Sequence, residues 1–186
     1  MWFQEADKIY LVPIGKIQWW ILEDVKTTLE ERFLFSVTIV DSVPFPYEAV
    51  TREREQMDTR EIFRILSDWS PKGLVIGVID FDIFTQGVNF LFGEADPVEG
   101  IAVVSMARLR EEFYGSEPAQ ELMIERLKKE VVHEMGHLFS LRHCPHDRCV
   151  MHFSNTISTT DFKTDRFCPV CSKTLKEVTD GGYQAL

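Results

Sequence analysis

The chain has 186 residues, of which 45% are hydrophobic and 27% charged, and its formal net charge is −10 at pH 7. This length and composition fit a single globular domain with a substantial core, and the acidic balance argues against a nucleic-acid surface of clustered Lys and Arg. No apolar stretch reaches the roughly 20 residues that span a bilayer, and the N-terminal residues lack the features of a signal peptide. We therefore expect a cytoplasmic monomer that binds neither nucleic acid nor a membrane.

The first part of the chain predicts strands and helices in alternation. Lys8–Gly15 is a short apolar run closed by glycine, which predicts a buried strand. Ser36–Val43 is β-branched and alternating, which predicts a second strand that Pro44 and Pro46 end. The helix predicted between these strands has apolar residues at every third or fourth position, as on one face of an amphipathic helix: Ile17, Trp20, Ile21, Val25, Leu29 and Phe33.

The middle of the chain adds one helix and three strands. Residues 47–57 are polar and charged, which predicts a loop, and Asp58 can cap a helix that runs to about Trp69. The apolar face of that helix consists of Ile62, Ile65, Leu66 and Trp69. Gly73–Ile79 predicts a central strand buried on both faces, and two further apolar runs predict shorter strands at Asn89–Gly93 and Ile101–Ser105.

A long helix is expected next, with Ser116 as its N-cap and Pro118 in its first turn. Its apolar stripe contains Met123, Leu127, Val131 and Leu138. Residues 144–171 are polar and irregular, lack the apolar mass of a core and therefore need a cross-link. A closing helix is expected over Ser172–Val178, and Gly181 and Gly182 would begin a frayed end. This order of elements indicates an α/β sheet with helices packed against it.

The histidines and cysteines are clustered. All five histidines lie between His133 and His152, and all four cysteines lie between Cys144 and Cys171. Scattered core residues would not gather in one segment in this way, whereas metal ligands do.

The histidine spacing predicts a catalytic metal site. His133 and His137 are four residues apart, so on a helix they lie on one face and can bind one ion. Glu134 is close enough to reach a metal-bound water without binding the metal. His143 supplies a third nitrogen if the helix ends before it. Three protein ligands and a water make an open, catalytic zinc site.

The cysteine spacing predicts a second, structural site. Two close pairs, Cys144 with Cys149 and Cys168 with Cys171, enclose a longer loop, as in four-thiolate zinc sites. Such a site contributes roughly 10–16 kcal/mol of apparent binding energy to folding. The alternatives are disulfides, or thiolates combined with His146 or His152, although both histidines are expected to be surface loop residues.

The motif His133-Glu134-x-x-His137-x-x-Ser140-x-x-His143, followed by Met151, resembles the metzincin clan of zinc peptidases. With the four cysteines added, the segment resembles the archaemetzincin family in particular. The resemblance implies that His133, His137 and His143 bind the catalytic zinc, that Glu134 is the general base and that Met151 forms a turn beneath the site. It also implies that residues 89–93 form the edge strand of the cleft, to which an extended peptide could add as a further strand.

The same resemblance implies a metzincin-like α/β fold with a mixed, mostly parallel twisted sheet and an active-site helix. Residues 1–186 would form one catalytic domain, with an upper subdomain at 1–142 and a small irregular lower subdomain at 143–186 that the four-cysteine zinc site stabilises. One departure concerns Ser140, where the family pattern has glycine. Glycine lets the chain turn sharply towards the third histidine, whereas a non-glycine residue in the left-handed region costs roughly 1–2 kcal/mol.

The leading hypothesis is therefore a zinc metallopeptidase with two Zn²⁺, one catalytic and one structural, that hydrolyses peptide or small protein substrates through a zinc-bound water activated by Glu134. The alternative is a non-catalytic or weakly active peptide-binding protein with a structural cysteine zinc and a poorly occupied histidine site. Ser140 favours this alternative and the presence of Glu134 opposes it. A chance His-Glu-x-x-His on an exposed helix is the third possibility, and the third histidine and the cysteine set oppose it.

Overall fold

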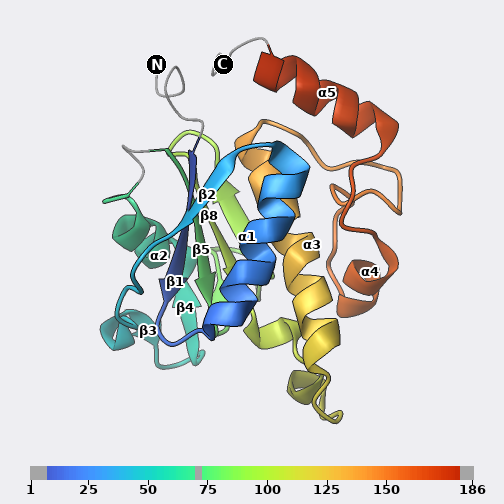
Figure 1. The fold of residues 1–186 in the computed structure, drawn as a ribbon. Coiled ribbons are helices and arrows are strands. Elements are labelled where there is room, and N and C mark those ends of the chain that lie inside the picture. Colours follow the sequence, from blue (N-terminus) through green and yellow to red (C-terminus); the bar gives the residue numbers. More distant parts are fainter. Residues whose placement is uncertain (1–7, 70–72, 181–186) are drawn as a thin grey trace.

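The computed structural model describes residues 8–69 and 73–180, and its centre is a five-stranded sheet (Figure 1). The strand order is β2-β1-β5-β8-β7. Neighbouring strands pair in parallel except β7, which is antiparallel to β8 at one edge. The sheet is thus mixed and mostly parallel, as expected. Its strands are β1 (Lys8–Ile14), β2 (Ser36–Ile39), β5 (Leu74–Ile79), β7 (Gly93–Asp96) and β8 (Ile101–Ser105).

Helices cover both faces of this sheet (Figure 1). Helices α1 (Trp19–Phe33) and α3 (Gln120–Leu138) pack on one face, and α2 (Thr59–Leu66) packs on the other. Strand β5 shows the two faces directly, because Ile76 and Val78 belong to the core cluster with α1 and α3, while Val75 and Ile79 belong to the cluster with α2. The prediction of a central strand buried on both faces is confirmed.

The segment predicted as a loop at residues 47–57 has structure of its own. It contains a 3₁₀ turn (η1, Tyr47–Ala49) and two short strands, β3 (Val50–Thr51) and β4 (Gln56–Asp58). Strand β4 pairs with β3 and with β6 (Ile83–Phe84) in a small second sheet. Met57 of β4 and its partner Ile83 of β6 are both fully buried, so core packing of these two side chains stabilises the pairing rather than an apolar pattern within β4.

The predicted strand at Asn89–Gly93 is wrong in its bounds. The strand next to β8 is β7, which runs from Gly93 to Asp96 and is largely polar. The apolar residues before it make only an isolated bridge, between Leu91 and Ile83, and use their side chains for packing, as where Phe90 meets Phe92 edge-on.

Several element ends also differ from the expectation. Strand β2 ends at Ile39, before the exposed Asp41 and Ser42, although Val43 still makes one bridge to Ile14. Helix α1 begins at Trp19, and its second residue, Trp20, is exposed rather than part of the buried face.

Ser116 is not the N-cap of α3. The helix begins at Gln120 with Ala119 at its N-cap, and no side chain caps it. Ser116 instead donates its amide to Glu111 O at 3.1 Å and closes the 3₁₀ turn η4 (Glu111–Tyr114), which follows η3 (Ala107–Leu109). Pro118 accordingly lies before the helix.

The C-terminal part contains more helix than predicted. Helix α4 (Ile157–Phe162) lies within the segment expected to be irregular, and α5 (Pro169–Asp180) begins before and ends after the expected bounds. Cys149, Val150 and Met151 pack into the same core cluster as α3. The predicted frayed end at Gly181 and Gly182 lies outside the described residues. No helix in the described parts of the chain is long and apolar enough to cross a membrane.

Candidate active site and metal centres

Helix α3 places two imidazoles side by side. All four residues of its predicted apolar stripe are buried against the sheet, which fixes the helix rotation. His133 and His137 lie one turn apart on the same face, with their ring centroids 4.7 Å apart and their Nε2 atoms 3.1 Å apart. The helix ends at Leu138, before His143, as the site requires.

The end of α3 is a Schellman motif with serine at the left-handed position. Ser140 has φ +60°, the amide of Leu141 donates to Gly136 O at 3.0 Å, and the amide of Ser140 donates to His137 O at 2.8 Å. The chain therefore makes the sharp turn that glycine would make, at the conformational cost of a side chain in this region.

After this turn, His143 meets the other two histidines. Its ring centroid lies 5.3 Å from that of His133 and 4.9 Å from that of His137. One possible ligand nitrogen from each of the three rings lies within 4.8 Å of the others. His143 is exposed and also contacts the ring of Phe153 at 4.9 Å.

Backbone acceptors fix the tautomers of the two helical imidazoles. His133 donates Nδ1–H to Val150 O at 2.7 Å, and His137 donates Nδ1–H to Leu141 O at 2.8 Å, because a carbonyl oxygen can only accept. Both Nε2 atoms then present lone pairs to each other at 3.1 Å, an arrangement that a cation stabilises. Two nitrogens bound to one tetrahedral zinc lie about 3.3 Å apart. The donor set therefore fits zinc.

Burial keeps these imidazoles neutral. It lowers the pKa of His133 well below its usual range, and the nearby ammonium of Lys163 lowers it further. Burial also lowers the pKa of His137, against the opposing effect of its hydrogen bond to Leu141. A neutral imidazole is the form that binds a metal.

Glu134 lies beside the imidazoles and is buried, with 5% of its surface exposed. Burial raises the pKa of its carboxyl well above the usual range, the carboxylates of Glu130 and Glu94 raise it further, and Lys163 opposes them. A carboxylate with a raised pKa takes up a proton readily, which suits a general base.

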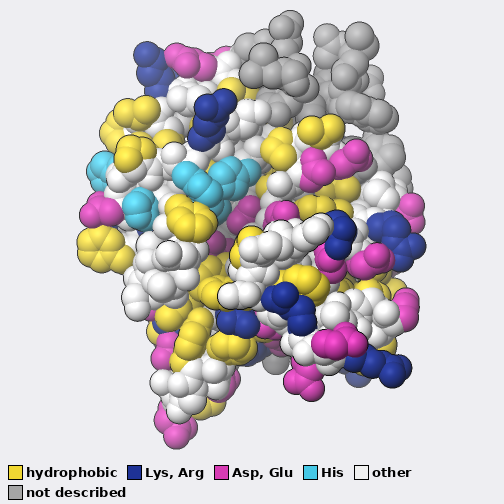
Figure 2. Space-filling model, turned by 180° about the vertical axis from the view of Figure 1, so that it is seen from behind, with side chains coloured by type: hydrophobic (Ala, Val, Ile, Leu, Met, Phe, Trp, Pro, Cys, Tyr) yellow, Lys and Arg dark blue, Asp and Glu magenta, His cyan; other side chains and the backbone are white. Residues whose placement is uncertain are grey.

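The three histidines and Glu134 open into a cavity of about 540 Å³. Residues 88–95 line one side of it, so the predicted strand segment borders the cleft even though the strand itself begins at Gly93. Phe153 and Asn155, from the chain after the histidine motif, also line the cavity. Figure 2 shows the histidines gathered on one face of the molecule next to hydrophobic side chains.

Met151 is fully buried and packs against Gly136 of α3. A Cβ atom on Gly136 would collide with its Sδ, so this glycine allows the close approach. Met151, in the turn after Cys149, thus contacts α3 at the residue before His137.

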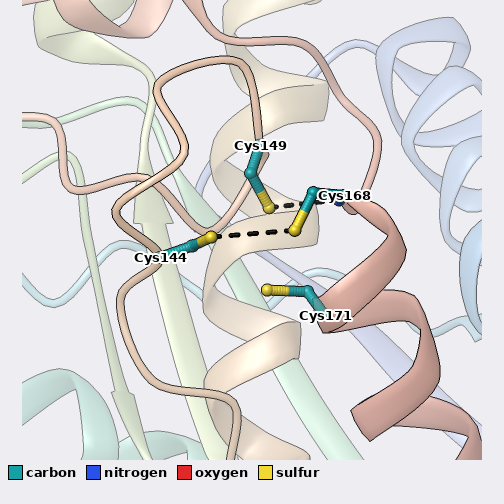
Figure 3. A group of neighbouring side chains, drawn as sticks. All are labelled: Cys144, Cys149, Cys168 and Cys171. Carbon is teal, nitrogen blue, oxygen red and sulfur yellow. Dashed lines mark hydrogen bonds between the residues drawn. The ribbon is translucent and has the colours of Figure 1, made fainter.

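The four cysteines form a second group (Figure 3). Cys144 and Cys149 lie on the loop after His143, Cys168 precedes α5 and Cys171 lies in its first turn. All four thiols are free, and their sulfurs lie within 4.8 Å of one another. The Sγ atoms of Cys144 and Cys168 are 3.7 Å apart, close to the about 3.8 Å expected for two thiolates on one tetrahedral zinc and far from a disulfide.

Backbone amides donate to two of the four sulfurs and favour their thiolate forms, although burial raises the pKa of Cys149 and Cys171. The amide of His146 donates to Cys144 Sγ at 3.4 Å, and that of Cys168 donates to Cys149 Sγ at 3.3 Å. Burial opposes ionisation of Cys168, but hydrogen bonds from the Cys171 amide and from other thiols lower its pKa to about 7. The donor set therefore also fits zinc.

His146 and His152 belong to neither group of possible ligands. His146 is exposed, and the half-buried His152 bonds through Nδ1 to Cys144 O at 3.0 Å. Their predicted place in surface loops agrees with this arrangement.

Sequence reasoning missed a buried ion pair next to the site. Lys163 is almost completely buried and contacts Glu130 Oε1 at 3.0 Å, and Thr160 donates to the same oxygen. Glu130 lines the cavity. Glu130 could have been found from the sequence, because a residue three positions before His133 lies on the same helix face. The polar segment around Lys163 contains no pattern that indicates its burial.

The grouped imidazoles could hold a metal ion, and comparisons with known proteins give the class of protein to which they belong. A sequence profile described as "Peptidase family M54" matches residues 47–177. An archaemetzincin from Pyrococcus furiosus is 39% identical over 186 aligned residues, which are 95% of this chain and 96% of that protein.

Solved structures agree with the sequence comparison. The archaemetzincin from Methanopyrus kandleri superposes with a TM-score of 0.81 at 32% identity, and the match covers 95% of this chain and 97% of that protein's chain. A zinc-dependent peptidase from Methanocorpusculum labreanum superposes with a TM-score of 0.83 at 28% identity, covering 90% and 99%. The chain belongs to peptidase family M54, the archaemetzincins, and is a zinc metallopeptidase.

Proposed function

We propose that the chain hydrolyses peptide bonds at a zinc ion bound by His133, His137 and His143, with Glu134 as the general base. The observation that carries this proposal is the pair of Nε2 atoms, 3.1 Å apart, whose rings are oriented by backbone acceptors. When bound there, zinc would acidify a water and polarise the carbonyl of the scissile bond.

Glu134 would move the proton. As the water attacks the carbonyl carbon, the carboxylate accepts a water proton and then donates it to the departing amine. Its buried position excludes competing bulk water, and its raised pKa favours proton uptake.

The substrate would bind along β7. This strand is at the edge of the sheet, so one side of its backbone is free to pair with an extended peptide. The cavity beside it has a mostly apolar lining, which suits apolar side chains of a peptide. Residues before position 142, such as 88–95, and residues after it, His143 and 153–155, both line the cavity. We therefore also propose an upper subdomain at 1–142 and a lower one at 143–186 within one catalytic domain.

A second zinc would be bound by Cys144, Cys149, Cys168 and Cys171, which makes two Zn²⁺ per chain. The grouping of their sulfurs and the amide donors at two of them support this proposal. Met151 would form the turn beneath the catalytic zinc, as its contact with α3 suggests.

The rival function, peptide binding without cleavage, loses its main support in this geometry. It rested on Ser140, and Ser140 adopts the left-handed turn that leads to His143. The buried Glu134 has no purpose in a peptide-binding site of that kind.

The test combines metal content with a substitution of the base. We expect two zinc ions per chain by mass spectrometry, and we expect E134Q to retain both while hydrolysis of a peptide library falls by at least about 10²–10⁴-fold. The matched control is E125Q, which changes an exposed glutamate on the same helix. Unchanged turnover in E134Q would refute the role of Glu134. A zinc content that stays at one ion per chain after dialysis against zinc would favour the rival function.

A further inference from the structure

The loop from His143 to His152 joins the two groups of possible metal ligands. His143 is followed directly by Cys144. Cys149 is followed directly by Val150, whose carbonyl accepts the Nδ1–H of His133 at 2.7 Å. At each end of the loop, a thiol is therefore the chain neighbour of a group that forms the imidazole site.

His143 depends on this loop more than the other imidazoles do. His133 and His137 lie on α3, and each has a backbone acceptor for its Nδ1–H. Neither ring nitrogen of His143 has a hydrogen-bond partner among the described residues, and its ring packs on Phe153, which is itself 53% exposed. The position of this third imidazole is therefore set mainly by the backbone that leads into Cys144.

The end of the loop is supported by the buried side chains of Val150 and Met151 and by the hydrogen bond that His152 Nδ1–H donates to Cys144 O at 3.0 Å. The stretch between the two cysteines has little support from its own side chains. Residues 145–148 are exposed, and the loop is closed by backbone bonds from Cys144 N to Met151 O at 2.9 Å and from Cys149 N to His146 O at 3.0 Å. Its side-chain connection to α5 runs through the thiols, where Cys144 meets Cys168 at 3.7 Å and Cys149 accepts the Cys168 amide. A metal at these sulfurs would fix both ends of the loop to the start of α5.

We propose that Cys144 and Cys149 are positioning residues of the imidazole site. A metal bound at the four thiols orders the loop that places His143 and the Val150 carbonyl, and it thereby raises the affinity of the three imidazoles for zinc. This inference rests on the proposed function, which assigns both groups as metal sites. The coupling is reciprocal, because each site must change the affinity of the other by the same factor. Loss of an outer-shell partner lowers metal affinity by about 10–100-fold, which is the size we expect here.

The experiment measures metal affinity rather than activity. The full chain, freed of metal under reducing conditions, is titrated with Co²⁺ in equilibrium dialysis. The thiolate charge-transfer band gives the amount of metal at the thiol site, and the total metal bound less that amount gives the metal at the imidazole site. In C168S/C171S the thiol site is lost while every residue of the loop is retained. We expect its imidazole site to bind Co²⁺ about 10–100-fold more weakly than in the wild type. V170S changes an exposed residue between the same two cysteines and should match the wild type.

A second variant keeps the proposal testable if C168S/C171S does not fold. C171S retains three thiolates and should bind metal at the thiol site more weakly. At low Co²⁺ the thiol site stays empty, so the imidazole site should bind Co²⁺ weakly. Once the thiolate band saturates, the affinity of the imidazole site should return to the wild-type value. General damage to the fold would show no such recovery. A folded C168S/C171S with wild-type imidazole affinity would overturn the coupling and leave the proposed function intact. A wild type that never binds a second metal would overturn both.

Discussion

Glu134 lies against the backbone of the edge strand at Gly93. A Cβ atom at this position would lie 2.7 Å from Cγ of Glu134, 2.9 Å from its Oε1 and 2.9 Å from Val103 O. Gly93 has no unusual backbone conformation, so only the missing side chain matters here. The glycine thus makes room for the carboxylate beside the imidazoles.

We expect G93A to displace this carboxylate and to lower kcat/KM by about 10²-fold, because small errors in the placement of a catalytic group are costly. Zinc content should not change, since the imidazoles are not touched. The matched control is G77A, whose added Cβ would meet Leu66 at a similar 2.7 Å in the core away from the site. Peptide hydrolysis and metal content are measured for both. Wild-type turnover in G93A would show that the base does not depend on this contact.

The sequence could predict the site residues that belong to a motif but not those that support them. The spacing of His133, Glu134 and His137 follows from helix geometry alone. The role of Gly93 depends on which residue of the edge strand faces Glu134, and this register is a tertiary property. Lys163 is a single lysine in a polar segment, so nothing in its neighbourhood indicates that it is buried against Glu130.

At the scale of an element, helix α2 shows how one capping residue defines a start. Asp58 accepts the Arg60 amide at 3.0 Å and pairs with the Arg60 guanidinium at 2.6 Å. The side-chain hydrogen bond from Arg60 lowers the pKa of Asp58, partial burial opposes this shift and the backbone hydrogen bond adds to it. The folded state therefore favours the carboxylate more than the unfolded state does.

We expect D58A to lower the free energy of unfolding by about 0.5–2 kcal/mol at neutral pH. Because the folded pKa lies below the unfolded value of about 3.9, this contribution is complete above pH 4 to 5 and is lost as the pH falls through the folded pKa. Urea unfolding at pH 7 and near pH 3 measures the change. D58N retains an acceptor that does not titrate, so its stability relative to D58A should not vary in this window. A D58A difference that is equal at both pH values would contradict the carboxylate as the cause.

Elements with strong periodic patterns were predictable, and elements defined by their partners were not. The central strand β5 and the stripe of α3 could be predicted because their burial follows from apolar residues in sequence. Strands β3, β4 and β7 are short and polar, and they exist because another strand offers backbone groups at the right register. The start of α3 was missed because Ser116 closes a 3₁₀ turn instead of capping the helix.

At the scale of the whole molecule, the sheet with α1 and α3 and the C-terminal segment differ in what stabilises them. The sheet and these helices bury a continuous apolar cluster. The segment after His143 contributes few buried apolar side chains, and three of them belong to the thiol group itself: Cys149, Val150, Met151, Cys168, Cys171 and Leu175. The proposed structural zinc is therefore expected to stabilise this segment more than the sheet.

Removal of metal should accordingly loosen the C-terminal segment first. A ligand present at 1,000 times its dissociation constant stabilises a fold by about 4 kcal/mol, and chelation removes that contribution. We expect amide hydrogen exchange to rise in residues 143–180 on treatment with a chelator under reducing conditions. The amides of β1, β5 and β8 should remain protected, because most of the apolar side chains that cover these strands come from α1, α2 and α3 rather than from the segment with the thiols. Mass spectrometry of peptic fragments measures both regions, and excess Zn²⁺ should restore the protection. Equal loss of protection across the sheet would show that the metal stabilises the whole domain, and unchanged exchange in residues 143–180 would show that the four thiols need no metal to fold.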